Sequence, residues 1–144
     1  MIYLASDHAG FKLKVKAKKY LTKQNIAFID LGTESESPVD YPTYAGVLAK
    51  NVLDNNAMGI LICGTGIGMS IAVNRYHNIR GALCYSSKMA CFARQHNDAN
   101  VLVLPGRNRL VAFRLKRIIK TFLNTEFEGG RHKHRIDMIE QVQK

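Results

Sequence analysis

The sequence predicts an α/β fold: a doubly wound parallel sheet of five strands, followed by a C-terminal helical arm. Short apolar runs alternate five times with longer stretches whose apolar residues recur every three or four positions. The apolar runs are continuous, which is typical of parallel strands covered on both faces. The 144 residues fit one domain of roughly 100 to 200 residues, so we expect a single unit over residues 1–144.

The first two strand–helix units fill the first third of the chain. Residues 2–5 form a short apolar run, and the next segment has a helical pattern with apolar residues on one face and lysines on the opposite face. Residues 26–31 form the second run, and the polar segment 33–40 is expected to be a loop. Pro42 suits the first turn of a helix, which the apolar spacing extends to Asp54.

The other three units follow in the same order. Residues 59–63, 80–84 and 101–104 are the third, fourth and fifth apolar runs. Helical spacing marks residues 68–75 and 86–95 after the first two of these runs. A long amphipathic helix follows the last run, with apolar positions at Val111, Leu115, Ile118, Ile119 and Phe122.

The C-terminal segment predicts a short helix with a narrow apolar stripe. A basic run over residues 131–135 precedes Ile136, Ile139 and Val142 at helical spacing. Such a helix often buries its apolar face against a second subunit. A frayed surface helix is the alternative.

Charge and cysteine content narrow the classes of function. Lys and Arg total 21 against 11 acidic residues, so the net charge of +10 favours a phosphorylated metabolite, a nucleic acid or an acidic membrane surface as partner. Three cysteines cannot form a complete disulfide set, so we expect free thiols in the cytoplasm. The N-terminus has no leader-like pattern, and four glycines in the uncharged segment 57–73 argue against a membrane helix.

The carboxyl ends of the strands are the place to expect a ligand, because loops and helix N-termini meet there in an open parallel sheet. Asp7 and His8 follow the first strand, and a glycine-rich loop at 64–68 follows the third. Its alternate glycines let backbone N–H groups face one bound anion. The loop matches neither a P-loop nor a dinucleotide fingerprint, and tight turns also use glycine for packing alone.

Cys63, directly before this loop, is the candidate base. Main-chain amides at the start of a helix would stabilise its thiolate form. The alternative interpretation is that Cys63 is a small buried residue that packs as an apolar side chain. We keep that alternative for Cys84 and Cys91. His96 and Asn97 belong to a polar cluster that closes the fourth helix, where a helix-end histidine with no catalytic role is the alternative.

Cations for an anionic ligand follow the fifth strand and fill the C-terminal basic run. Arg107 lies just after the fifth strand, and Arg131 and Arg135 are four residues apart, so they would share a helical face and grip one phosphate together. Otherwise the run 131–135 is a solvated basic turn. No zinc-binding spacing of cysteine or histidine is present, so we expect no metal.

Taken together, the polar motifs resemble the ribose-5-phosphate isomerase B family, whose wider membership includes galactose- and allose-6-phosphate isomerases. The resemblance runs from residue 2 to about 140. It implies a Rossmann-like sheet of five parallel strands, with active sites between the subunits of a homodimer or a dimer of dimers. The motifs that carry it are Ser-Asp-His-Ala-Gly at 6–10, Cys-Gly-Thr-Gly-Ile-Gly-Met-Ser at 63–70, His-Asn-Asp-Ala-Asn at 96–100 and Arg-His-Lys-His-Arg-Ile-Asp at 131–137.

The resemblance implies a cofactor-free aldose–ketose isomerase of the pentose phosphate pathway, which interconverts D-ribose 5-phosphate and D-ribulose 5-phosphate through a cis-enediolate. In such an enzyme Cys63, with Thr65 beside it, would move a proton between C2 and C1, and His96, helped by Asp7, would open the sugar ring. The amides of 64–68 would stabilise the enediolate. The residues implied in binding sugar or phosphate are His8, Tyr41, Gly64, Gly66, Ile67, Gly68, Asn97, Arg107, Arg131 and Arg135.

Two alternatives stay open. Cysteine ends the third strand, and Met69 stands where some relatives carry glutamate, so the chain is similar to the cysteine-base branch of the family. A hexose-6-phosphate isomerase, acting on allose or galactose 6-phosphate, is the first alternative. A nucleic-acid-binding module that uses the +10 charge is the second. We expect neither a nucleic-acid nor a membrane partner, because lysines lie along the first helix while arginines fall near strand ends.

Overall fold

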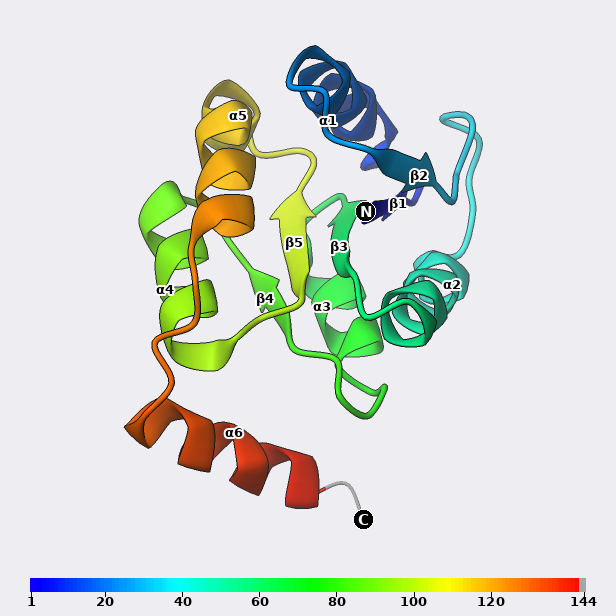
Figure 1. Ribbon diagram of the computed structural model, residues 1–144. Helices are drawn as coiled ribbons and strands as arrows, with labels where there is room; N and C mark the ends of the chain where they lie inside the picture. The colour runs from blue at the N-terminus through cyan, green and yellow to red at the C-terminus, as the bar shows by residue number, and fades with distance from the viewer. Residues whose placement is uncertain (143–144) are drawn as a thin grey trace.

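The computed structural model describes residues 1–142 and has the predicted α/β architecture, a parallel sheet between two layers of helices (Figure 1). The strand order is β2-β1-β3-β5-β4, and every neighbouring pair is parallel. The strands are β1 (Ile2–Ser6), β2 (Phe28–Asp30), β3 (Met58–Cys63), β4 (Gly81–Leu83) and β5 (Val101–Pro105). The helices are α1 (Phe11–Lys23), α2 (Tyr41–Asp54), α3 (Ile67–Val73), α4 (Ser87–Asn97), α5 (Arg109–Asn124) and α6 (Arg131–Gln141).

The doubly wound, five-stranded sheet is therefore confirmed, although its two edge strands are shorter than predicted. The apolar runs 26–31 and 80–84 contribute only β2 and β4, of three residues each. Both strands lie at an edge of the sheet, where a ladder of hydrogen bonds holds them from one side only. Edge position thus shortens strands whose sequence alone predicts longer ones.

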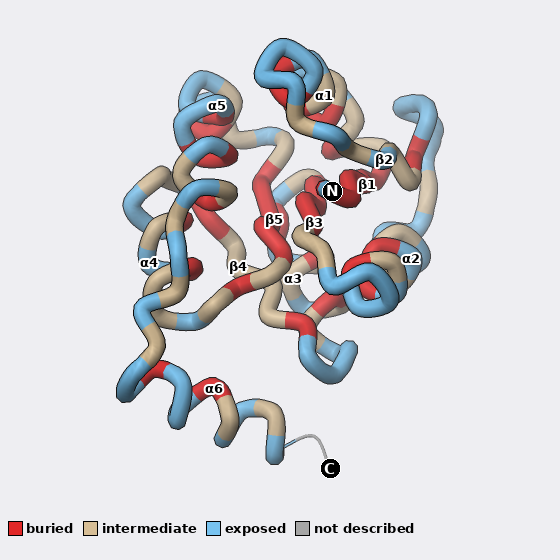
Figure 2. The backbone as a smooth tube through the Cα atoms, in the orientation of Figure 1, coloured by how far each residue is buried: buried red, intermediate tan, exposed pale blue. Residues whose placement is uncertain are grey.

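Alternate residues of the central strands point into two separate cores. Nearly all residues of these strands are buried (Figure 2). Ile2 and Leu4 of β1 pack with α1, α4 and α5, whereas Tyr3 and Ala5 pack with α2 and α3. Because β1, β3 and β5 are buried on both faces, these three neighbouring strands form a rigid centre. Any loop at their carboxyl ends is held by that centre.

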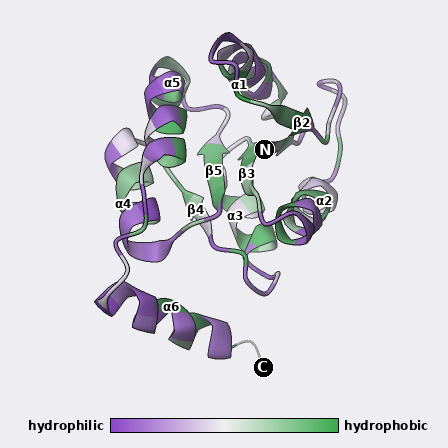
Figure 3. Cartoon of the chain, in the orientation of Figure 1, coloured by the Kyte–Doolittle hydropathy of each residue, from purple (hydrophilic) through white to green (hydrophobic). Residues whose placement is uncertain are grey.

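Helix α6 lies apart from the two layers and packs against α4, as the expected helical arm (Figures 1 and 3). The basic run at its start is helical and not a turn; His132 is buried, whereas the other four residues of the run are exposed to solvent. Ile136 is buried, but Met138 and Ile139 are about half exposed. The arm therefore presents apolar side chains that this chain alone does not cover.

The lysines of α1 do not all face solvent, which corrects the sequence expectation. Lys14 is fully buried, and its Nζ lies 2.5 Å from Oδ1 of Asp30 and 2.6 Å from the carbonyl oxygen of Thr33. Lys18 donates to the other Asp30 oxygen at 2.6 Å. Burial acts to raise the pKa of Asp30, but hydrogen bonds from both lysines and from the Gly32 N–H outweigh it, so that pKa lies below its ordinary value.

We expect Asp30→Asn to lower the free energy of unfolding by about 3 to 5 kcal/mol, because it leaves the buried Lys14 ammonium without a counter-charge. Urea unfolding at pH 7 measures this loss. Lys18→Gln is the control: its side chain is partly exposed, so we expect a loss of roughly 1 kcal/mol or less. Equal stability of the Asp30 variant and the parent would contradict this account.

The ion pair between Asp30 and Lys14 makes the stability of the fold depend on pH. The Asp30 pKa is lower in the folded chain than the value of about 3.9 expected after unfolding. Its contribution to stability is therefore complete above the unfolded pKa and is lost as the pH falls through the folded pKa. The Asp30→Asn variant should lack this part of the acid dependence of unfolding.

Candidate active site

Three loops meet at the carboxyl ends of β1, β3 and β5, as the sequence predicts. The Gly106 N–H donates to the carbonyl oxygen of Cys63 at 2.7 Å, and the Arg107 N–H donates to that of Gly64 at 3.0 Å. The Asp7 N–H donates to the carbonyl oxygen of Ile62 at 3.1 Å. These main-chain bonds hold the segments 7–10, 64–68 and 106–107 together, and we call this region the carboxyl-edge group.

Two glycines allow this close approach. A Cβ atom on Gly10 would lie 2.3 Å from the carbonyl oxygen of Ile62. A Cβ atom on Gly106 would lie 2.9 Å from the Gly10 Cα. Since no side chain fits at either position, the backbones of the three loops pack directly against one another.

Gly66 shapes the loop in front of α3. Its φ of +80° is left-handed, and an added Cβ would lie 2.3 Å from Cδ1 of Leu83. We expect Gly66→Ala to lose about 1 to 2 kcal/mol through backbone strain and a further 1 to 3 kcal/mol through overpacking.

Urea unfolding checks this loss, and Gly129→Ala is its control. Gly129 also has a positive φ, but no atom lies within 4 Å of an added Cβ, so only the strain applies there. Equal losses in the two variants would show that the Leu83 contact is unimportant.

Cys63 and Thr65 lie side by side along the chain in different environments. Cys63 ends β3 and is 4 % exposed, whereas Thr65 is exposed and its Oγ1 accepts a hydrogen bond from the Ile67 N–H at 3.3 Å. The other two cysteines differ from Cys63. Burial raises the pKa of Cys84 to about 12, and the Cys91 sulfur donates to Oε1 of Gln95. Cys84 follows the carboxyl end of β4 but is buried in the core on the other face of the sheet from Cys63.

Three other predicted side chains, those of Asp7, His8 and Tyr41, lie around the loop 64–68. Oδ1 of the buried Asp7 accepts the Gly10 N–H at 2.9 Å. His8 accepts the Val39 N–H at Nδ1, 3.2 Å away, which leaves the proton of the neutral ring on Nε2. The Tyr41 ring packs over Gly68, where an added Cβ would lie 2.8 Å from its Cζ.

Four other predicted site residues lie where the strands begin, at the opposite end of the sheet from the carboxyl-edge group. We call them the amino-edge group: His96, Asn97, Arg131 and Arg135. α4 ends at Asn97, whose carbonyl oxygen accepts a hydrogen bond from Nε of Arg80, just before β4 begins. Arg131 and Arg135 are exposed on α6, which packs against α4 (Figure 1). One five-residue strand, about 16 Å long at roughly 3.3 Å per residue, separates the two edges.

The ring of His96 is held in a stack of three aromatic rings. The Phe92 ring lies 5.0 Å from it and the His132 ring 4.5 Å, both nearly parallel to it. Oε2 of Glu128 lies 3.9 Å from Nε2 of His96 and 3.6 Å from Nε2 of His132. Burial is the main cause that lowers the pKa of His132 below its ordinary value, and the nearby charges of His96 and Arg131 lower it further. The contact of Glu128 and His132 with His96 was not predicted from the sequence, because nothing in the residue pattern distinguishes them from a solvated segment.

Within residues 1–142, the side chains of His96, Glu128 and His132 form one set that could bind a metal ion. Their donor atoms lie within 4.8 Å of one another. The two imidazole planes are nearly parallel, so their lone pairs do not converge on a common point. We assign no ion to this set.

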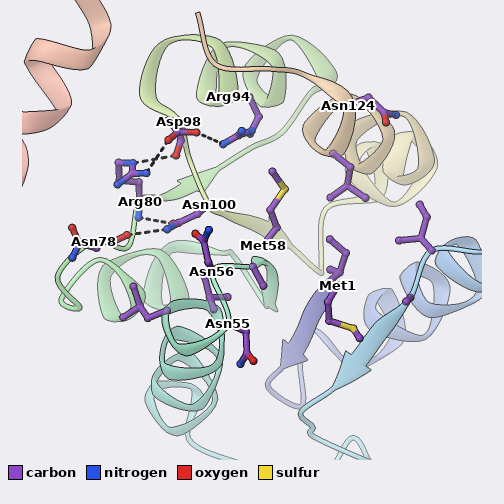
Figure 4. Close-up of a pocket in the computed structure, with 17 residues that line it drawn as sticks. Met1, Asn55, Asn56, Met58, Asn78, Arg80, Arg94, Asp98, Asn100 and Asn124 are labelled. Atoms are coloured by element: carbon purple, nitrogen blue, oxygen red, sulfur yellow. Dashed lines mark hydrogen bonds and ion pairs between the residues drawn. The ribbon is translucent and has the colours of Figure 1, made fainter. Parts of the chain in front are cut away.

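A pocket of about 790 Å³ also lies where the strands begin (Figure 4). Arg80 and Arg94 both reach into it and pair with Asp98, at 3.2 and 2.7 Å. Arg94 also donates to the carbonyl oxygen of Ala99. Because these cations are already paired, we place no phosphate in this pocket.

Comparisons with known proteins agree with the site's motifs. The model of the ribose/galactose isomerase family matches residues 2–139. The chain belongs to this isomerase family. Within the ribose/galactose isomerases, it is 40 % identical to ribose-5-phosphate isomerase B of Escherichia coli, over 99 % of this chain and 95 % of that one.

Two solved structures of the same family extend the comparison. Ribose 5-phosphate isomerase of Thermotoga maritima superposes with a TM-score of 0.95 at 54 % identity, covering 98 % of this chain and 97 % of that one. The Mycoplasma genitalium enzyme, solved with bound ribulose 5-phosphate, gives 0.92 at 40 % identity, covering 99 % and 95 %. No helix within residues 1–142 is long and apolar enough to span a bilayer.

Proposed function

We propose that this protein interconverts D-ribose 5-phosphate and D-ribulose 5-phosphate through a cis-enediolate. The observation that carries the proposal is the position of Cys63, a thiol at the end of a central strand beside a loop of close-packed main-chain amides. A related isomerase, aligned over nearly the whole chain, binds ribulose 5-phosphate. A cytoplasmic location stays a prediction from the cysteines.

The reaction requires one proton to move between neighbouring carbons. The Cys63 thiolate would take the proton from C2 of the open-chain aldose, and the resulting thiol would return it to C1. A second proton would pass from the oxygen on C2 to the oxygen on C1, so that the aldehyde becomes an alcohol and the C2 alcohol becomes a ketone. Main-chain N–H groups of 64–68 would donate to the enediolate oxygen, where negative charge develops, and Thr65 lies next to the base. C1 is reduced and C2 is oxidised within the same molecule, so no external oxidant, reductant or cofactor is needed for this transfer.

We propose that the active site is completed by a second copy of the chain. Cys63 and His96 lie at opposite edges of one sheet, so His96, Asn97, Arg131 and Arg135 of one chain would face the carboxyl-edge group of its partner. The ring-opening histidine and two phosphate-binding arginines then come from the partner, whereas Asp7, His8, Tyr41 and Arg107 come from the chain that holds the base.

Exposed apolar side chains support this assembly. They lie on α3, α4 and α6, which flank the two halves of the site, and an interface there would remove their apolar surface from water. Pairing of two copies about a two-fold axis buries the same surface on both chains and makes two equivalent sites. The residues concerned are Ile67, Ile71, Met89, Phe92, Met138 and Ile139.

A substrate comparison tests the function. We expect turnover of ribose 5-phosphate, followed by ketose absorbance, to exceed that of allose 6-phosphate and galactose 6-phosphate by about 10-fold or more, since one additional carbon in a fitted pocket costs about 1 to 3 kcal/mol. Addition of a chelator should leave the rate unchanged. A strong preference for either hexose phosphate would contradict the proposal.

A further inference from the structure

The basic charge of the chain is concentrated on two neighbouring helices away from the proposed active site. α1 contains six lysines, α5 contains five Lys or Arg residues, and neither helix contains an acid. The two helices lie side by side on one face of the sheet (Figures 1 and 3). We expected no nucleic-acid partner because lysines follow the first helix and arginines fall near strand ends; the fold, however, places three further arginines, on α5, beside the lysines of α1.

Few of these cations are used inside the chain. Within residues 1–142, only Lys12, Lys14 and Lys18 of these helices form ion pairs, with Glu36 or Asp30. The other three lysines of α1 and all five cations of α5 are exposed and have no acidic partner in that part of the structure. This charge exceeds what one sugar phosphate requires.

A groove of about 480 Å³ runs between the two helices. Lys16, Lys19, Lys23 and Lys116 line it, together with the aromatic side chains Tyr20 and Phe113. Phe113 is 87 % exposed. Spacing along α5 places Arg109, Arg117 and Lys120 on the same face as Phe113. A concave row of cations beside an uncovered aromatic ring is therefore present.

We propose that this groove binds single-stranded nucleic acid, with lysines on the phosphates and Phe113 stacked on a base. Cations that follow a groove and aromatic rings that stack on bases are the two elements of such binding. A second copy fits poorly, because this face would meet another face of like charge. The concave shape favours a strand over a flat bilayer surface. The inference stands independently of the isomerase proposal.

Fluorescence anisotropy of a labelled 12-nucleotide oligo(dT) with the full-length chain tests this inference. We expect saturable binding at 50 mM salt, and a slope of log affinity against log salt near −3, since each of four neutralised phosphates contributes about −0.7. Phe113→Ala should weaken binding by about tenfold through loss of stacking. Its isomerase turnover should be unchanged, because no residue of the groove belongs to the proposed active site.

A matched pair of double variants separates the groove from net charge. Lys19→Gln with Lys116→Gln should make the salt slope about 1.4 less steep, whereas Lys50→Gln with Arg75→Gln, which removes two exposed cations elsewhere, should leave it unchanged. Absence of binding at 50 mM salt, equal effects of the two double variants, or full affinity of Phe113→Ala would overturn the inference. Tighter, Phe113-dependent binding to phosphatidylserine vesicles than to the oligonucleotide would overturn it too.

Discussion

Cys63→Ala is expected to lower kcat for ribose 5-phosphate by about 10²- to 10⁴-fold, the contribution typical of a positioned general base. The variant loses the sulfur but keeps the loop, because the hydrogen bonds of residues 63 and 64 use main-chain carbonyl oxygens. Phosphate affinity should persist, since the groups proposed to hold the phosphate are histidine and arginine side chains. Turnover by ketose absorbance and binding of ribulose 5-phosphate by calorimetry measure the two effects separately.

The other two cysteines provide matched controls. Cys84 is buried, which raises its pKa to about 12, and the Cys91 sulfur donates a hydrogen bond to Oε1 of Gln95 within α4, so neither thiol is placed as Cys63 is, at the end of β3 directly before the loop 64–68. Cys84→Ala and Cys91→Ala should keep nearly full turnover, although Cys84→Ala can lower stability by about 1 kcal/mol. Near-normal activity of Cys63→Ala, or an equal loss in all three variants, would contradict the assignment of the base.

The alternation of apolar runs and amphipathic stretches is sufficient to predict the fold. The three central strands are buried on both faces and read as continuous apolar runs, and the long stripe from Val111 to Phe122 is buried in α5 as expected. The spacing of Lys14 to Ala17 and Leu21 places it on the apolar face of α1, but its residue type is typical of solvent, so its burial was not predicted. Only the tertiary contact with Asp30 and Thr33 reveals why an ammonium group is stable there.

The site was predictable as a set of residues but not as an arrangement. Strand ends and glycine spacing identify Asp7, His8 and the loop 64–68, because carboxyl ends of neighbouring parallel strands must lie together. His96 belongs to the end of a helix that returns the chain to the other edge, so it cannot join Cys63 within one chain. The sequence motifs do not show this separation, because a motif does not indicate whether it lies at the carboxyl ends or at the amino ends of the strands.

Mixing of two inactive variants tests the shared active site most directly. His96→Gln removes the ring-opening group and Cys63→Ala removes the base, so each homodimer should be nearly inactive. In an equal mixture refolded together, half of the dimers contain both chains, and each of these has one complete site if the halves come from different subunits. The recovered turnover should then be about a quarter of the parent value.

The parent chain mixed with the double variant Cys63→Ala, His96→Gln provides the matched control. If the halves come from different subunits, mixed dimers have no complete site and about a quarter of the parent turnover is retained; if both residues act within one chain, about half is retained. The account predicts a quarter in both mixtures. No recovery in the first mixture, with half retained in the second, would contradict it.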